Sequence, residues 1–143
     1  EPDLPEVNFY SGALGQMKLF EGILEIYKKG KSKKFRGYGI NQLSSSKFLD
    51  DYLNYFVKKR HSFGVETSLF IGQGKDDFGI TNDTNALGRT IKHIDIESQM
   101  AGIYYVQDRM YLFSYKDNVG IMIRNKTIVQ MLKDIFDDHW NRV

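Results

Sequence analysis

The chain has 143 residues, a formal net charge of +2 at pH 7 and an aromatic share of 14%. This length fits one domain with a sizeable core, and the aromatic share argues against disorder. The small net charge excludes binding to nucleic acid or membranes through the overall electric field alone. Because the chain has no cysteine and no apolar run near the roughly 20 residues of a membrane span, we expect a cytoplasmic protein without disulfides or thiolate metal sites.

Strands and helices alternate in the first half of the chain. Residues 7–10 are a strand candidate, and apolar residues recur at three- and four-residue spacings over residues 14–27, as in a helix. Residues 34–40 alternate like a strand, residues 48–60 form a second amphipathic helix, and residues 63–72 are a buried strand. Because this alternation implies parallel strands joined by crossover helices, we predict three mostly parallel strands with two helices packed on them.

The second half of the chain predicts further strands and a last helix. Residues 73–89 are polar, have no clear period and are expected to form a loop. Strand candidates follow at residues 90–96, 103–106, 110–115 and 119–123. We expect Asn125 to cap a helix that buries Leu132, Phe136 and Trp140. The fold class is therefore α/β, with a parallel first half and antiparallel strands added by residues 90–123.

Four stretches, taken in their order, resemble the phospholipase D-like fold. Two helix-to-strand passages of that family are similar to LFEGILEIYKKGKSKKFRGYGI and YFVKKRHSFGVETSLFIG. Its hairpin is similar to IYYVQDRMYLFS, and its closing strand and helix are similar to VGIMIRNKTIVQMLKDIFDDHW. The resemblance covers nearly the whole chain and implies a phospholipase D-like mixed sheet with helices packed on it.

The first residues resemble the junction that opens the C-terminal domain of TrmB-like transcriptional regulators. That domain follows a winged helix and a linker, and its opening proline, strand and helix are similar to LPEVNFYSGALGQMKLFEGIL. The resemblance implies a linker remnant at residues 1–6, from a missing upstream winged-helix domain, and a single phospholipase D-like domain at residues 7–143. It also implies a homodimer that contacts DNA through the winged helix and senses a small polar effector, with no cofactor and no membrane contact.

The catalytic signature of the phospholipase D-like family is H-x-K-x-x-x-x-D, in which the histidine is the nucleophile and the lysine holds phosphate. The aspartate belongs in the hairpin turn, at Gln107 or Asp108. These two registers place the following residues at the histidine and lysine positions: Met100 and Gly102, or Ala101 and Ile103. Neither pair supplies a nucleophile or a cation, so we expect a protein that is not an enzyme. The alternative is a phospholipase D-like phosphodiesterase or nuclease that uses other residues.

A rim at the ends of the parallel strands is the candidate ligand site. In open α/β sheets, ligands bind beyond the carboxyl ends of parallel strands. The loops after Ile40 and Ile71 bring polar and glycine residues to this rim, and His93, in the next strand candidate, can face a cleft there. The predicted ligand-binding residues are Asn41, Gln42, Ser44, Ser45, Gly72, Gln73, Lys75 and His93.

Other polar groups are better explained by structure than by function. His61 and His139 fall at helix ends, where a cation interacts favourably with the helix dipole. The basic run at residues 28–36 is better explained as a solvated helix end than as a contact for nucleic-acid phosphates. We expect no specific metal site at residues 137–139.

The dimer interface is expected to involve a group of aromatic residues. Aromatic side chains are favoured at interface centres, and a two-fold interface uses the same patch on both subunits. The patch expected here runs from the second half of the sheet to the rim near Gln73, and its tyrosines are Tyr104, Tyr105, Tyr111 and Tyr115.

Overall fold

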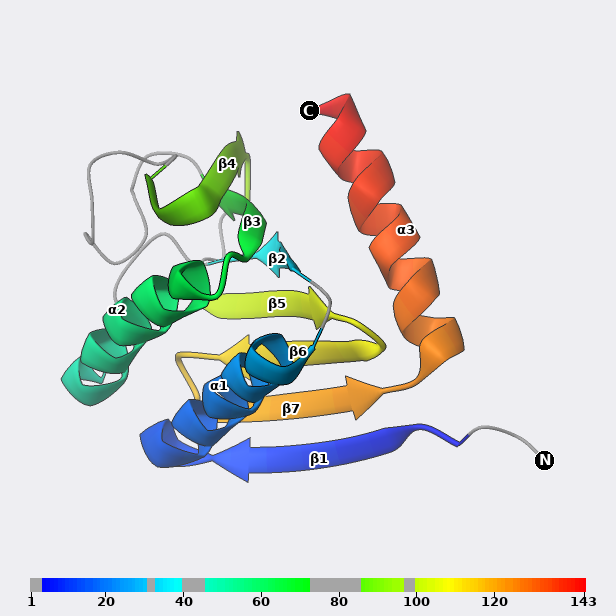
Figure 1. Ribbon diagram of the computed structural model, residues 1–143. Helices are drawn as coiled ribbons and strands as arrows, with labels where there is room; N and C mark the ends of the chain where they lie inside the picture. The colour runs from blue at the N-terminus through cyan, green and yellow to red at the C-terminus, as the bar shows by residue number, and fades with distance from the viewer. Residues whose placement is uncertain (1–3, 31–32, 40–45, 73–85, 97–99) are drawn as a thin grey trace.

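The computed structural model of the chain describes residues 4–30, 33–39, 46–72, 86–96 and 100–143 (Figure 1). Its elements are β1 (Glu6–Ser11), α1 (Gly12–Lys29), β2 (Lys34–Tyr38), α2 (Lys47–Ser62), β3 (Glu66–Gly72), the short 3-10 helix η1 (Ala86–Gly88), β4 (Arg89–Ile94), β5 (Ala101–Val106), β6 (Arg109–Ser114), β7 (Val119–Arg124) and α3 (Lys126–Arg142). The strands form one mixed sheet in the order β1-β7-β6-β5-β2-β3-β4. The expected α/β class is confirmed.

Strands β2, β3 and β4 form the parallel part of the sheet. β3 pairs in parallel with β2 on one side and with β4 on the other. The expectation that residues 90–123 add only antiparallel strands is therefore wrong for β4. A parallel neighbour needs a connection of about a dozen residues or more, and residues 73–88 are long enough to return the chain to the start of β3. The alternation of apolar and polar residues along a strand does not encode the direction of the strand, so the sequence pattern could not reveal this pairing.

Strands β5, β6, β7 and β1 form the antiparallel part. The consecutive pairs β5–β6 and β6–β7 are the antiparallel neighbours expected from the sequence. β1 runs in the same direction as β2 and β3, but it pairs with β7 at the far edge. Residues 7–71 therefore supply one parallel pair, not three parallel neighbours, because α1 carries the chain from the edge strand back across the sheet (Figure 1).

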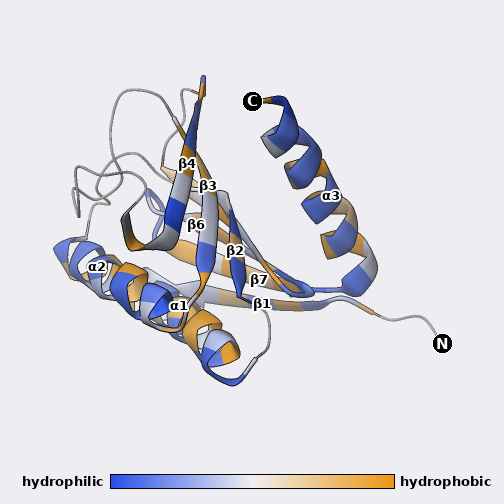
Figure 2. Ribbon diagram, turned by 45° about the horizontal axis from the view of Figure 1, so that its top comes forward, coloured by the Kyte–Doolittle hydropathy of each residue, from blue (hydrophilic) through white to orange (hydrophobic). Residues whose placement is uncertain are grey.

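The two faces of the sheet carry different helices. Helices α1 and α2 cover one face, and α3 crosses the other (Figure 2). On the first face, Phe20 and Ile23 of α1 are buried together with Leu53 of α2. Phe20 stacks on Phe113 of β6, with ring centroids 4.3 Å apart and 6° between the planes. Large aromatic rings remove much apolar area from water, so this face holds the larger core of the domain.

Side chains that accept from backbone amides mark the starts of α2 and α3. Ser46 Oγ accepts a hydrogen bond from Leu49 N at 3.2 Å, and Asn125 Oδ1 accepts one from Ile128 N at 2.8 Å. Asn125 lies where the sequence predicts a cap, because capping depends on groups three residues apart. Among the described residues, no helix is both long and apolar enough to cross a membrane.

Helix α3 packs on the second face through a smaller cluster. Phe136 is buried there as expected, and it lies against Phe70 of β3 and Tyr105 of β5. The other two residues expected to be buried, Leu132 and Trp140, are only half-buried at the border of this cluster. The reason is that α3 is the only described helix on this face of the seven-stranded sheet, so no neighbouring helix covers the residues at the sides of its contact with the strands.

The tyrosines expected at a dimer interface lie in the core. Tyr104, Tyr105, Tyr111 and Tyr115 are all buried. They stand on β5 and β6 or directly after β6, in the middle of the sheet, where a helix covers each face. The prediction that they form the dimer interface is therefore wrong, because aromatic side chains on these central strands pack in the core.

Candidate functional site

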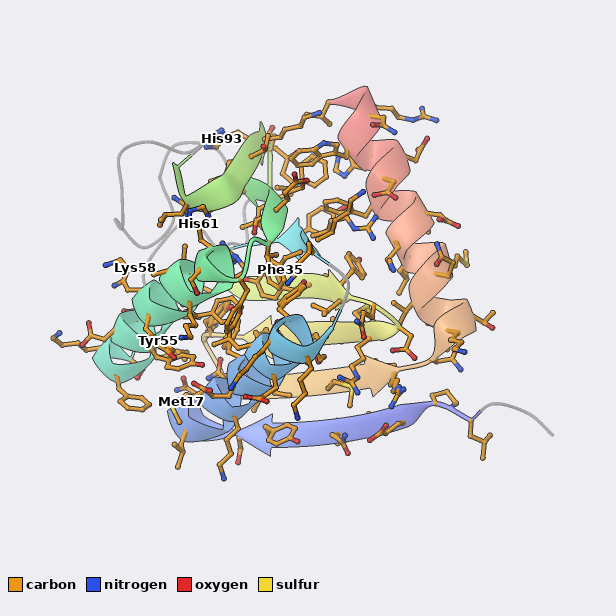
Figure 3. All side chains as sticks on the ribbon, viewed as in Figure 1. Met17, Phe35, Tyr55, Lys58, His61 and His93 are labelled. Atoms are coloured by element: carbon orange, nitrogen blue, oxygen red, sulfur yellow. The ribbon has the colours of Figure 1, made fainter. Side chains whose placement is uncertain are left out.

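Only part of the predicted ligand rim falls within the described residues. Asn41, Gln42, Ser44, Ser45, Gln73 and Lys75 lie outside them. Gly72 and His93 are described, and the register of β3 with β4 pairs Ile71 with His93 and Gly72 with Ile94. Gly72 is buried at the end of β3, and His93 is exposed near the end of the edge strand β4 (Figure 3). The structure therefore brings these two residues to the same end of the sheet.

The positions of the catalytic signature are apolar in both registers. In one register, Met100 and Gly102 hold the places of the histidine and the lysine. A Cβ atom added at Gly102 would lie 2.8 Å from Tyr104 Oη and 3.0 Å from the nearest ring carbons of that tyrosine. Contacts below 3.0 Å require something to shift, so a lysine at this position would displace Tyr104. In the other register, Ala101 and Ile103 offer no polar group.

The hydroxyl pair next to these positions is structural in character. Tyr104 Oη and Tyr115 Oη are 3.1 Å apart in the core. Burial raises the pKa of Tyr115 well above its ordinary value, and the neighbouring Tyr104 raises this pKa further. The Tyr115 hydroxyl therefore stays protonated at neutral pH. Such a neutral pair stabilises the core, but it lacks the anionic form that a general base needs.

A polar pocket lies on the second face of the sheet, between β2, β3 and the C-terminal half of α3. Its volume is about 330 Å³. We call it the β2–α3 pocket, and the residues that line it are Lys34, Arg36, Glu66, Ser68, Phe136, Asp137, Trp140 and Asn141. Two basic and two acidic residues balance each other, and an indole ring forms part of the wall. This arrangement suits a small ligand that offers both hydrogen-bond donors and acceptors.

An ion pair between Arg36 and Asp137 forms one side of the β2–α3 pocket. Arg36 Nη1 lies 3.0 Å from Asp137 Oδ1 and 2.9 Å from Asp137 Oδ2. The Arg36 Nε atom is buried and has no hydrogen-bond partner among the described residues. A buried donor without a partner costs free energy, so a ligand acceptor that reaches Nε would gain that amount on binding.

Trp140 is held in place from the edge of the sheet. Lys92 Nζ, on β4, donates to Trp140 O at 2.6 Å and to Val143 O at 2.9 Å. The same ammonium group lies 4.5 Å from the centroid of the Trp140 ring. A cation at the C-terminal end of a helix and above an aromatic face is favourable on both counts. Lys92 therefore fixes the indole wall of the pocket.

The two other histidines, His61 (Figure 3) and His139, lie at helix ends, as the sequence predicts. His61 is exposed in the last turn of α2. His139 has closer contacts than expected, since its Nδ1 lies 3.0 Å from Tyr38 Oη and its ring stacks on Phe70 at 4.2 Å. Burial raises the pKa of Tyr38, so this hydroxyl is protonated at neutral pH. His139 thus connects α3 to β2 and β3.

Sequence reasoning missed the β2–α3 pocket. It placed the ligand site at the carboxyl ends of the strands, whereas the pocket lies nearer their amino ends. A signal was present in β2 and β3, where Lys34, Arg36, Glu66 and Ser68 occupy alternate positions and so share one face. Arg36 belongs to the basic run at residues 28–36 but faces α3, so this run does not face solvent as a whole. Within the described residues, no group of three or more metal-ligating side chains forms.

Comparisons with known proteins identify the fold. No family model matches the chain, and no curated protein matches it. One similar solved structure is TrmBL2, described as an archaeal chromatin protein with a novel mode of DNA binding. That comparison has a TM-score of 0.59 and 11% identity, and it covers 99% of this chain and 54% of TrmBL2.

Two further solved structures belong to other classes of protein. Nuc from Salmonella typhimurium, a phospholipase D family member, has a TM-score of 0.63 and 14% identity, with 96% of this chain and 95% of Nuc covered. Polyphosphate kinase from Porphyromonas gingivalis has a TM-score of 0.63 and 12% identity, with 94% of this chain and 26% of the kinase covered. The chain spans about half the length of TrmBL2 and about a quarter of the kinase. At these identities the comparisons show the fold alone, and that fold is phospholipase D-like.

Proposed function

We propose that this chain is a non-catalytic domain of a cytoplasmic, DNA-binding transcriptional regulator of the TrmB-like type, and that it senses a small polar effector and dimerises. The similarity to TrmBL2 supports this role, because the domain aligns with about half of a protein described as binding DNA. In this proposal, an upstream winged helix contacts the DNA. This domain then supplies ligand binding and self-association.

The observation that carries the proposal is the chemistry of the signature positions. Met100 and Gly102, or Ala101 and Ile103, stand where the phospholipase D-like family uses a histidine and a lysine. A phosphodiester is attacked in that family by a nucleophile and held by a cation, and neither group is present at these positions. The fit of Tyr104 against Gly102 supports a site that no longer accommodates the lysine.

Phosphodiester hydrolysis tests the non-catalytic part of the proposal. The purified chain is incubated with bis(p-nitrophenyl) phosphate and, separately, with phospholipid vesicles. We expect rates equal to those of the buffer blank. The variants His93→Ala and His139→Ala are assayed beside the parent chain, because histidine is the nucleophile of the family. Turnover above the blank that either substitution removes would favour the alternative, a hydrolase that uses displaced residues.

The β2–α3 pocket is the proposed effector site. It offers charged groups of both signs, the hydroxyl of Ser68, the amide of Asn141 and the indole of Trp140. These groups recognise a small polar molecule through several hydrogen bonds and one apolar surface. Because Arg36 and Asp137 come from a strand and a helix, a ligand that contacts both would change how firmly α3 is held on the sheet. Such a change is one way in which effector binding reaches a distant DNA-binding unit.

A further inference from the structure

The second face of the sheet divides into a charged part and an uncharged part. On β2, β3 and β4, the side chains that face α3 include Lys34, Arg36, Glu66 and Lys92. On β5, β6, β7 and β1, the paired positions on the same face hold only apolar residues, alanine, serine and one tyrosine. Successive side chains of a strand point to opposite faces, so this assignment follows from the register. Four neighbouring strands therefore present a face without a charged residue.

Helix α3 leaves much of that uncharged part open. Leu112 and Ile123 border the cluster under α3 and are half-buried. Further from the helix, Phe9 of β1 is 75% exposed, Val7 is 43% exposed and Val119 of β7 is 38% exposed. A phenylalanine exposed to this degree beside two valines is unusual on the sheet of a monomer.

A stripe on α3 continues this apolar surface. Ile128, Met131 and Ile135 are 44%, 65% and 50% exposed, and their spacing of three and four residues puts them on one flank of the helix. The other flank carries Asp137, which binds Arg36, and Lys133, which donates to Gln107 O at 3.1 Å. The stripe therefore lies on the side of α3 that borders the uncovered strands. We call this stripe, together with Phe9, Ile121 and Leu112, the open face.

We propose that a second copy of this chain docks on the open face. This inference rests on the proposed function and names the surface through which the domain dimerises. Across a two-fold axis, the stripe of α3 on each copy covers the exposed strands of the other copy. A two-fold interface uses the same patch twice, so both stripes and both sheet surfaces are covered at once.

The size and chemistry of the open face favour a second copy over other partners. An aromatic side chain has roughly 150–250 Å² of surface and the aliphatic ones have somewhat less, so the exposed fractions given above together amount to several hundred Å² of apolar surface. A standard interface takes about 800 Å² from each partner, which the open face and its margins approach. Nucleic acid and anionic lipid headgroups both require cations, and the open face has none. Depletion of charge at the centre is typical of protein–protein interfaces.

Sedimentation equilibrium of the full chain tests the proposal across a concentration series. The chain has a mass of 16.6 kDa, so a dimer has twice 16.6 kDa. We expect the dimer mass for the parent chain. The variants Phe9→Glu and Met131→Glu place a charge in the sheet part and in the helix part of the open face. Each is expected to raise the dissociation constant about 30-fold or more, as for a central interface residue.

The control variant is Phe48→Glu. Phe48 is 53% exposed on α2, on the other side of the sheet, and this substitution is expected to leave the dimer unchanged. A second measurement needs no substitution, namely the rate of Met131 oxidation by peroxide at rising chain concentration. Met131 should become protected as the dimer forms, whereas the oxidation rate of Met17 on α1 should not change (Figure 3).

The possible outcomes separate this inference from the proposed function. A mass of 16.6 kDa at every concentration would overturn the proposed dimer and its surface together. A dimer that tolerates both open-face variants and leaves Met131 unprotected would overturn the surface alone. Equal weakening by Phe48→Glu would also contradict the surface. Phosphodiester hydrolysis by a dimer that both variants dissociate would overturn only the proposed function.

Discussion

Arg36 of β2 and Asp137 of α3 lie 101 residues apart in the sequence and form an ion pair, in which Arg36 Nη1 is 3.0 Å from Asp137 Oδ1 and 2.9 Å from Asp137 Oδ2. The side chain of Arg36 is 21% exposed and that of Asp137 is 48% exposed, so the pair is partly shielded from solvent. Hydrogen bonds between two charged groups are shorter and stronger than those between neutral groups. The pair fixes the orientation of α3 on the sheet and at the same time forms one side of the β2–α3 pocket.

Removing the carboxylate of this pair should destabilise the domain. Asp137→Asn leaves the Arg36 cation against the sheet without its counter-charge, and solvent access to Asp137 limits the loss. We expect the free energy of unfolding to fall by about 1–2 kcal/mol. Urea unfolding at neutral pH measures this change. The control Asp134→Asn, on the exposed side of α3, should change it by no more than about 0.5 kcal/mol. Equal effects of the two substitutions would contradict a specific role for the pair.

Adding a methyl group at Gly102 should disturb the site next to Tyr104. The new Cβ atom would lie 2.8 Å from Tyr104 Oη, and we expect Gly102→Ala to cost about 1–3 kcal/mol through overpacking. The matched control is Gly22→Ala on α1, where nothing lies within 4 Å of the added atom. Because alanine favours a helix, this control should gain about 0.5–1 kcal/mol. Thermal unfolding compares the two variants. A melting temperature that Gly102→Ala leaves unchanged would show that Tyr104 moves aside freely.

Alkaline pH should unfold the domain in part through Tyr105. Burial, followed by the nearby Tyr38, raises the pKa of Tyr105 to about 12, whereas a tyrosine in the unfolded chain has a pKa of about 10. Between these values the unfolded state loses a proton that the folded state keeps. The stabilising contribution is therefore complete below about pH 10 and is lost as the pH rises to about 12.

The variant Tyr105→Phe checks this pH dependence. Urea unfolding over the same alkaline range gives the free energy of unfolding for both chains. The variant should lose less stability with rising pH than the parent, because one titrating group has been removed. If the two chains lost stability at the same rate, ionisation of Tyr105 would not be a cause of alkaline unfolding.

Local features of the fold could be predicted from the sequence, and long-range pairings could not. Asn125 caps α3 at the expected place, because a cap and its amide are three residues apart. The place of β1 beside β7 depends on two segments more than a hundred residues apart, and the alternation of residues 7–10 does not encode a partner. The same limit hid the pocket, since Arg36 meets Asp137 only after α3 has crossed the sheet.

Exposure was the second property that the sequence pattern could not give. Tyr104 and Phe9 both occur in apolar strands, yet Tyr104 lies in the middle of the sheet and Phe9 on its edge. A buried residue and an interface residue have the same chemistry, so only the strand order separates them. The sequence pattern therefore places the aromatic stripe of β5 and β6 at an interface and does not indicate the open face.

The fluorescence of Trp140 directly tests whether this phospholipase D-like fold binds an effector in the β2–α3 pocket. Trp140 is the only tryptophan of the chain and lines that pocket, so its emission reports on the site itself. The chain is titrated with amino acids, polyols and small organic acids. The variant Arg36→Met removes a pocket cation, and Lys58→Met removes an exposed cation of α2 as the control (Figure 3).

We expect at least one class of compound to change the emission with a saturable dependence on its concentration. Arg36→Met should weaken that binding about tenfold or more, the loss expected for a charged hydrogen bond, and Lys58→Met should leave it unchanged. Emission that no compound alters, or a response that Arg36→Met preserves in full, would contradict effector binding in the β2–α3 pocket.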